Sequence, residues 1–124
     1  MSEQTDKPAV LVVEDEPLVR FTAADTIEDL GVSALEAQDA REALQLLAEH
    51  PQVKVLFTDI DMPGSMNGLQ LAAHVHQARP DVGIVVTSGK HSVEEHRLPD
   101  HGSFLPKPYR TEQLQQLVSS KLGE

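Results

Sequence analysis

The chain has 124 residues, of which 40% are hydrophobic, and it carries 20 acidic and 10 basic side chains, for a formal charge of −10 at pH 7. This length and apolar content allow one domain with a buried core and exclude wholesale disorder. The charge argues against nucleic acid or anionic membranes as partners. There is no cysteine for disulfides or thiolate sites. No apolar run could span a bilayer and no signal peptide is evident, so we expect a cytoplasmic protein.

Residues 1–8 are polar and predict a flexible tail before a domain over residues 9–123. The aliphatic run from Ala9 to Val13 predicts a strand buried on both faces. Pro17 suits the first turn of a helix, and Gly31 suits its end. Apolar residues repeat at helical spacing between them: Val19, Ala23, Ile27 and Leu30.

A weaker strand is predicted over residues 32–36. Asp39 and Glu42 then have the spacing of a capping box, and the helix they open ends at His50-Pro51. The next apolar run, Val53 to Thr58, predicts a buried strand that delivers Asp59 to the edge of the sheet. Inward positions of the helix are expected at Ala43, Leu44 and Leu47.

After the Pro63-Gly64 turn, a third helix is expected to begin at Asn67 or Gly68 and to end at Arg79-Pro80, with Leu69, Ala72 and Val75 inward. Residues 82–87 predict a fourth strand, which ends in the hydroxyl pair Thr87-Ser88.

A fourth helix within residues 90–101 should be short or mobile, because Leu98-Pro99-Asp100 interrupts it. Residues 103–107 predict a fifth strand, and Pro106 requires it to lie at a sheet edge. Thr111 is expected to cap the last helix. The predicted buried face of that helix is formed by Leu114, Leu117, Val118 and Leu122.

Strand and helix alternate five times, which predicts an α/β fold with a parallel sheet covered on both faces. In such sheets the ligand site lies at the carboxyl ends of the strands. Polar side chains that follow the strands should therefore meet at one edge: Glu14, Asp15, Asp59, Asp61, Thr87, Ser88 and Lys107.

These residue types suit phosphoryl transfer. Three neighbouring carboxylates, Glu14, Asp15 and Asp59, repel one another unless a cation binds between them, and hard oxygen ligands favour Mg²⁺. The backbone carbonyl of Asp61 could add a ligand. Asp59 would then have an oxygen free to attack phosphorus. Lys107 and the Thr87 hydroxyl could each contact phosphoryl oxygens.

Four motifs together resemble the receiver domain of two-component response regulators, and the match covers nearly the whole chain beyond the tail. The motifs are Val12–Glu16, Thr58–Pro63 with Gly68, Val85–Gly89 and Phe104–Tyr109. The resemblance implies a (βα)₅ flavodoxin-like three-layer fold with strand order 2-1-3-4-5. It also implies a protein that is no enzyme beyond Mg²⁺-dependent self-phosphorylation and autodephosphorylation.

The resemblance also implies roles for single residues. Asp59 matches the phosphoacceptor, which receives its phosphoryl group from a histidine kinase or a histidine phosphotransfer protein. Glu14 and Asp15 match the acidic pair, and Asp15 is the more direct Mg²⁺ ligand. Thr87 matches the switch hydroxyl and Lys107 the phosphate-binding lysine. Two further features are implied, Phe104 as the switch aromatic and a cis Lys107-Pro108 bond.

The chain departs from the family pattern in several places. Glu14 stands where Asp is usual, and Asp61 adds a charge where a neutral residue is common. Pro106 replaces an aliphatic residue. The loop over residues 62–68 is one residue longer than usual, and the segment over residues 87–107 is slightly short. No chemical part of the site is missing.

Other interpretations stay open at the level of single residues. An acidic pair after a strand is often only a helix cap. Asp59-Ile60-Asp61 has the form found in aspartyl phosphohydrolases, although these place it after the first strand. A module that binds partners without phosphate is a third possibility. His74 and His76 point to different faces of a helix, so we expect solvated histidines and no transition-metal site.

Because the sequence predicts no separate output domain, we expect a stand-alone regulator, a phosphate shuttle or sink, or a fragment of a hybrid kinase. The downstream partner is a protein that the sequence does not identify. We expect a monomer or a weak dimer.

Overall fold

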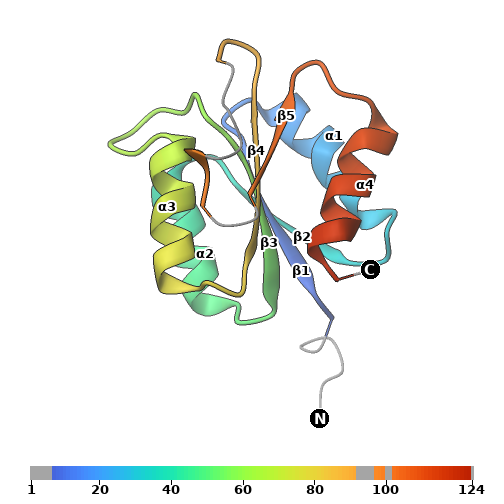
Figure 1. The fold of residues 1–124 in the computed structure, drawn as a ribbon, viewed down its shortest axis with the longest axis horizontal. Coiled ribbons are helices and arrows are strands. Elements are labelled where there is room, and N and C mark those ends of the chain that lie inside the picture. The colour runs from blue at the N-terminus through green and yellow to red at the C-terminus, as the bar shows by residue number, and fades with distance from the viewer. Residues whose placement is uncertain (1–6, 92–96, 100–101, 124) are drawn as a thin grey trace.

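The computed structural model describes residues 7–91, 97–99 and 102–123. Within these ranges one parallel sheet has the strand order β2-β1-β3-β4-β5. Helices α2 and α3 cover one face, and α1 and α4 cover the other (Figure 1). The strands are β1 (Ala9–Val13), β2 (Ser33–Ala37), β3 (Val53–Asp59), β4 (Gly83–Ser88) and β5 (Ser103–Pro106), and the helices are α1 (Pro17–Glu28), α2 (Ala40–Glu49), α3 (Gly68–Ala78) and α4 (Thr111–Lys121).

The predicted three-layer α/β fold and its strand order are confirmed. Strand ends differ from the prediction by a residue, and one difference matters for the site. Asp59 belongs to β3 and stands opposite Thr87 in the ladder with β4. Its backbone is therefore fixed by the sheet rather than by a loop. Pro106 is exposed on β5, which is an edge strand as expected, and the Lys107-Pro108 bond is cis.

The core consists of two clusters, one on each side of the sheet. Along β1, Leu11 and Val13 face α2 and α3, whereas Val10 and Val12 face α1 and α4. This alternation follows from the two-residue period of a strand. It explains why β1, which is covered on both faces, is apolar without interruption until the chain reaches the site.

Side chains cap the N-termini of α2 and α3. Asp39 accepts a hydrogen bond from the backbone N–H of Glu42 at 2.9 Å, as predicted. The carboxylate of Glu42 accepts the N–H of Gln38 rather than that of Asp39, at 2.8 Å. Asn67 and Gln70 form a reciprocal capping box at the start of α3, with both bonds at 2.9 Å. The chain therefore enters α3 in a fixed direction immediately after the site.

One helix prediction is wrong and a second is incomplete. The cap of α4 is Arg110, whose backbone is extended, and Thr111 is already the first helical residue. On α3 the predicted residues Ala72 and Val75 are buried, but Leu71 is buried as well and Leu69 only partly. A helix packed against a sheet buries a stripe wider than one residue per turn, which the spacing did not resolve.

Two predicted segments fall largely outside the described residues. The expected tail includes residues 1–6, and the expected fourth helix includes residues 92–96 and 100–101. Of that second segment, Leu98 is described, and it is buried against the core on the α3 side. None of the helices in the described ranges has the length and apolar character required to cross a membrane.

Candidate functional site

A cavity of about 600 Å³ opens at the carboxyl ends of the strands. It is lined by the segment after β1 and the start of α1, by the end of β3 and the loop after it, and by the loops after β4 and β5: Glu14, Asp15, Glu16, Val19, Asp59, Ile60, Asp61, Met62, Pro63, Asn67, Gly89, Lys90 and Lys107. A larger groove of about 1080 Å³ lies beside α3, but its described lining contains no carboxylate. The reactive groups therefore belong to the smaller cavity.

Three carboxylates meet in this cavity. Glu14, Asp15 and Asp59 each place an oxygen within 4.8 Å of the other two. Glu14 is 4% exposed and Asp59 is 6% exposed, whereas Asp15 is open to solvent. Such a cluster is costly unless positive charge balances it. The donor set of hard oxygens could hold a metal ion of the Mg²⁺ type.

Lys107 supplies part of that positive charge. Its Nζ lies 3.0 Å from Oε1 of Glu14 and 3.6 Å from Oδ2 of Asp59. The second oxygen of Glu14 accepts the backbone N–H of Glu16 at 3.2 Å. Both oxygens of Glu14 therefore have partners. Lys107 bridges Glu14, which follows β1, and Asp59, which ends β3.

Asp59 and Thr87 are less satisfied. Among the described residues, Oδ1 of Asp59 and Oγ1 of Thr87 are the buried side-chain oxygens that have no hydrogen-bond partner. Buried polar atoms in folded proteins are nearly always paired. The two residues stand opposite each other on β3 and β4. The sheet thus presents an unused carboxylate oxygen and an unused hydroxyl on neighbouring strands.

Burial dominates the electrostatics of the acids. Desolvation raises the pKa of Asp59, and the charge of Asp61 raises it further, while Lys107 acts in the opposite direction. Desolvation likewise raises the pKa of Glu14 against its hydrogen bond with Lys107. Burial alone would lower the pKa of Lys107, but the bond to Glu14 and the charge of Asp59 outweigh it and raise the pKa.

The close approach of α3 to β3 explains Gly68. A Cβ atom at this position would overlap the backbone carbonyl of Asp59. The N–H of Gly68 also donates to the carbonyl of Ile60 at 2.9 Å. Only glycine lets the helix begin this close to the candidate phosphoacceptor.

The predicted site residues divide into two groups. Glu14, Asp15, Asp59, Asp61 and Lys107 line one cavity, as the strand order predicts. Thr87 lies behind this cavity in the sheet. Phe104 is half-buried, stands opposite Val86 in the ladder, and packs against the core on the α3 side.

Three side chains at the site make contacts that were not expected from the sequence. Arg20 of α1 donates to the backbone carbonyl of Glu14 at 2.9 Å and to the Glu36 carboxylate at 3.1 Å. The Asp61 carboxylate contacts Ser88 at 3.3 Å and His91 at 3.1 Å. The ring of Tyr109 meets Phe57 edge to face, with centroids 5.8 Å apart. These contacts join residues from different elements, and no spacing in the sequence indicates them.

Comparison with known proteins places these features in a family. The family model described as "Response regulator receiver domain" matches residues 10–119. A chemotaxis protein CheY homolog of Campylobacter jejuni is 32% identical over 120 residues, which are 92% of this chain and 92% of that protein. A receiver protein of Sinorhizobium medicae has a similar solved structure, with a TM-score of 0.86, 25% identity and coverage of 95% and 96%.

Other relatives are much longer than this chain. The response regulator MprA of Mycolicibacterium vanbaalenii is 36% identical over 109 residues, or 85% of this chain and 46% of that protein. The sensor kinase CckA of Brucella abortus is 32% identical over 117 residues, or 91% of this chain and only 12% of the kinase. The domain thus occurs alone and inside larger proteins. Because the family model covers almost the entire described fold, this chain belongs to the response regulator receiver domains of two-component systems.

Proposed function

We propose that Asp59 is the phosphoacceptor of this receiver domain and that its donor is a phosphohistidine of a histidine kinase or a phosphotransfer protein. A carboxylate oxygen of Asp59 attacks phosphorus, and the bond between phosphorus and the imidazole nitrogen breaks. The nitrogen keeps the electron pair, and Asp59 becomes an acyl phosphate. The observation that carries the proposal is the buried Oδ1 of Asp59, which has no partner and belongs to a side chain that lines a cavity with Lys107.

The neighbouring residues support this reaction electrostatically. Nζ of Lys107 lies 3.6 Å from Oδ2 of Asp59. Its positive charge can therefore stabilise the negative charge on the phosphoryl oxygens during transfer to Asp59. Glu14, Asp15, Asp59 and the Asp61 carbonyl would hold Mg²⁺. The ion would neutralise charge on the transferring group. Asp15 is exposed and therefore offers the most accessible of these ligands.

We propose that Thr87 and Phe104 carry the signal. The phosphoryl group brings about two negative charges and three acceptor oxygens. The unpartnered hydroxyl of Thr87 can donate to one of these oxygens. Movement of Thr87 would open space behind β4 for the half-buried ring of Phe104. Phe104 precedes Leu105, the residue of β5 that stands opposite Thr87. The surface formed by β5 and α4 would then change shape.

The role of the domain in its pathway depends on which protein binds the surface formed by β5 and α4. The relatives include a chemotaxis regulator and a sensor kinase, and the fold fits either setting. We propose a regulator or phosphate shuttle that acts through a protein partner. Pull-down with and without beryllofluoride, which mimics the phosphoryl group, would identify a partner that prefers one state.

The experiment that tests the phosphoacceptor is incubation with acetyl phosphate and Mg²⁺, followed by intact mass measurement. Wild type should gain one phosphoryl group, and Asp59→Asn should gain none. Asp25→Asn on the exposed face of α1 is the matched control and should behave like wild type. Uptake by Asp59→Asn at the wild-type rate would contradict the assignment. Catalytic release of phosphate from many donors, without labelled protein, would instead favour a phosphohydrolase.

A further inference from the structure

The carboxylate of Asp61 is held by the last residue of β4 and by a residue of the loop that follows. Ser88 Oγ donates to Oδ2 at 3.3 Å, and Nε2 of His91 lies 3.1 Å from Oδ1. The carboxylate can only accept, so Nε2 carries the proton in this contact. Ser88 Oγ also accepts the backbone N–H groups of Lys90 and His91, at 3.1 and 3.0 Å. We call Asp61, Ser88 and His91 the Asp61 clasp.

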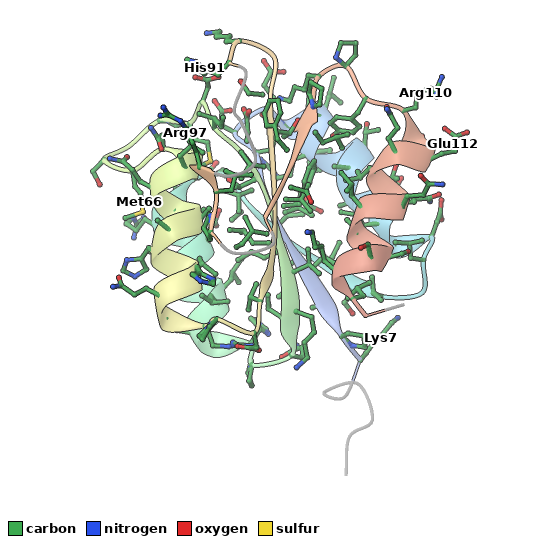
Figure 2. The ribbon with its side chains drawn as sticks, in the orientation of Figure 1. Lys7, Met66, His91, Arg97, Arg110 and Glu112 are labelled. Atoms are coloured by element: carbon green, nitrogen blue, oxygen red, sulfur yellow. The ribbon has the colours of Figure 1, made fainter. Side chains whose placement is uncertain are left out.

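The clasp adjoins the cavity through Asp61. Asp61 lines the cavity together with the three clustered acids. Burial raises the pKa of Asp59, and the negative charge of Asp61 raises it further. Figure 2 labels His91 at the upper end of the view, where the loop after β4 turns. A carboxylate in this position would be a natural extra ligand for a cation, yet each of its oxygens already has a partner.

We propose that His91 is a positioning residue that keeps the Asp61 carboxylate out of the coordination shell of the metal. The proposal rests on the proposed function, since it concerns the same cavity. With the clasp closed, Asp61 offers only its backbone carbonyl, and Glu14, Asp15 and Asp59 supply the charge. The clasp would thereby offset the unusual acid that the chain carries two residues after the phosphoacceptor.

The number of carboxylates matters for both affinity and reactivity. Mg²⁺ usually binds one or two carboxylates and keeps several waters, whereas Ca²⁺ accepts six to eight oxygens. A fourth carboxylate would therefore tighten binding and shift preference toward Ca²⁺. It would also neutralise charge that the cation needs for the incoming phosphoryl oxygens. An open clasp should thus bind metal better and accept phosphate worse.

The clasp can be opened without unfolding the domain. The side chains of His91 and Asp61 are 54% and 37% exposed. Exposed pairs of this kind contribute little to stability, so His91→Ala should fold like wild type. His91→Gln retains an amide donor for Asp61 and serves as the conservative variant. His74→Ala removes an exposed histidine from α3 and serves as the matched control.

The test is the dissociation constant of Mg²⁺ and of Ca²⁺, measured calorimetrically on the full chain. His91→Ala should bind Mg²⁺ about fivefold more tightly and Ca²⁺ by a larger factor. His91→Gln and His74→Ala should match wild type.

A second comparison removes the carboxylate that the clasp would release. In the Asp61→Ala background, which retains the backbone carbonyl, adding His91→Ala should change neither constant. A gain that persists in this background, or an unchanged Mg²⁺ affinity of His91→Ala, would overturn the inference while leaving the proposed function intact. Absence of Mg²⁺ binding by wild type would contradict both.

Discussion

The two ends of the sheet are built on opposite principles. At the amino end, Arg79 donates to the backbone carbonyls of Pro51 and Val53 at 3.2 and 3.0 Å and pairs with Asp81 at 3.0 Å. The hydrogen bond from Arg79 lowers the pKa of Asp81, which stabilises its charged form. At the carboxyl end, burial raises the pKa of Asp59 and leaves one of its oxygens without a partner.

This contrast separates the residues that hold the fold together from those that carry the chemistry. At the amino end, Arg79 joins two loops and its charge is paired with that of Asp81. These contacts lower the free energy of the folded state. The carboxyl end keeps desolvated acidic side chains, although apolar side chains in the same places would give a more stable fold. Unfavourable groups persist in a fold when the surrounding structure holds them for function. Substitutions at the two ends of the sheet should therefore differ in their effects on stability and on phosphate uptake.

Gly68→Ala should have the largest effect on stability. Its Cβ would overlap the Asp59 carbonyl, so α3 or β3 must shift, at a cost of about 3 kcal/mol or more. Denaturant unfolding measures the loss. Gly31→Ala is a control of a different kind, because its strain comes from a positive φ of 88° and not from contact with the site. If Gly68→Ala is as stable as wild type, residue 68 lies farther from the Asp59 carbonyl than the structure indicates.

Lys107→Met should cost about 2 kcal/mol near neutral pH, because Glu14 would be left buried without its cation. This estimate is reduced for the partial exposure of Lys107. The loss should shrink at acid pH, where Glu14 becomes protonated and no longer needs the lysine. The same variant should take up phosphate more slowly. Equal loss at every pH would show that the packing of the side chain, rather than its charge, accounts for the effect.

Arg79→Met should cost about 1 kcal/mol through lost hydrogen bonds at the amino end. Its rate of phosphate uptake should equal that of wild type, because no part of the site is touched. The pair of measurements distinguishes the two ends of the sheet directly. A reduced uptake rate would show that the amino end also controls the site.

Asp59→Asn should stabilise the domain, by about 1 kcal/mol near neutral pH. The raised pKa means that the folded state binds the Asp59 proton more tightly than the unfolded state does. The carboxylate therefore costs stability as pH rises through the ordinary aspartate range toward the raised pKa, and the full cost applies above it. The gain should vanish at acid pH. A variant less stable than wild type at neutral pH would contradict the claim that Asp59 is held at a cost.

Much of the fold and of the cavity could be predicted from residue patterns. The aliphatic runs of β1, β3 and β4 end in acids or hydroxyls, and a parallel sheet must bring those ends together. Contacts between side chains far apart in sequence could not be predicted. Nothing in the pattern pairs Asp61 with His91, or Arg20 with the carbonyl of Glu14, because these contacts depend on loop paths and rotamers. The cap at Arg110 was missed because the extended backbone there was not visible in the residue types.

The most direct test of the central claim is to locate the phosphoryl group within the chain. Protein treated with phosphodonor and Mg²⁺ is reduced with borohydride, which converts an acyl phosphate to an alcohol, and is then mapped by peptide mass. We expect the modification at position 59 alone, and only when donor and Mg²⁺ are both present. Modification at Asp15 or Asp61 instead, or equal modification without Mg²⁺, would contradict the account.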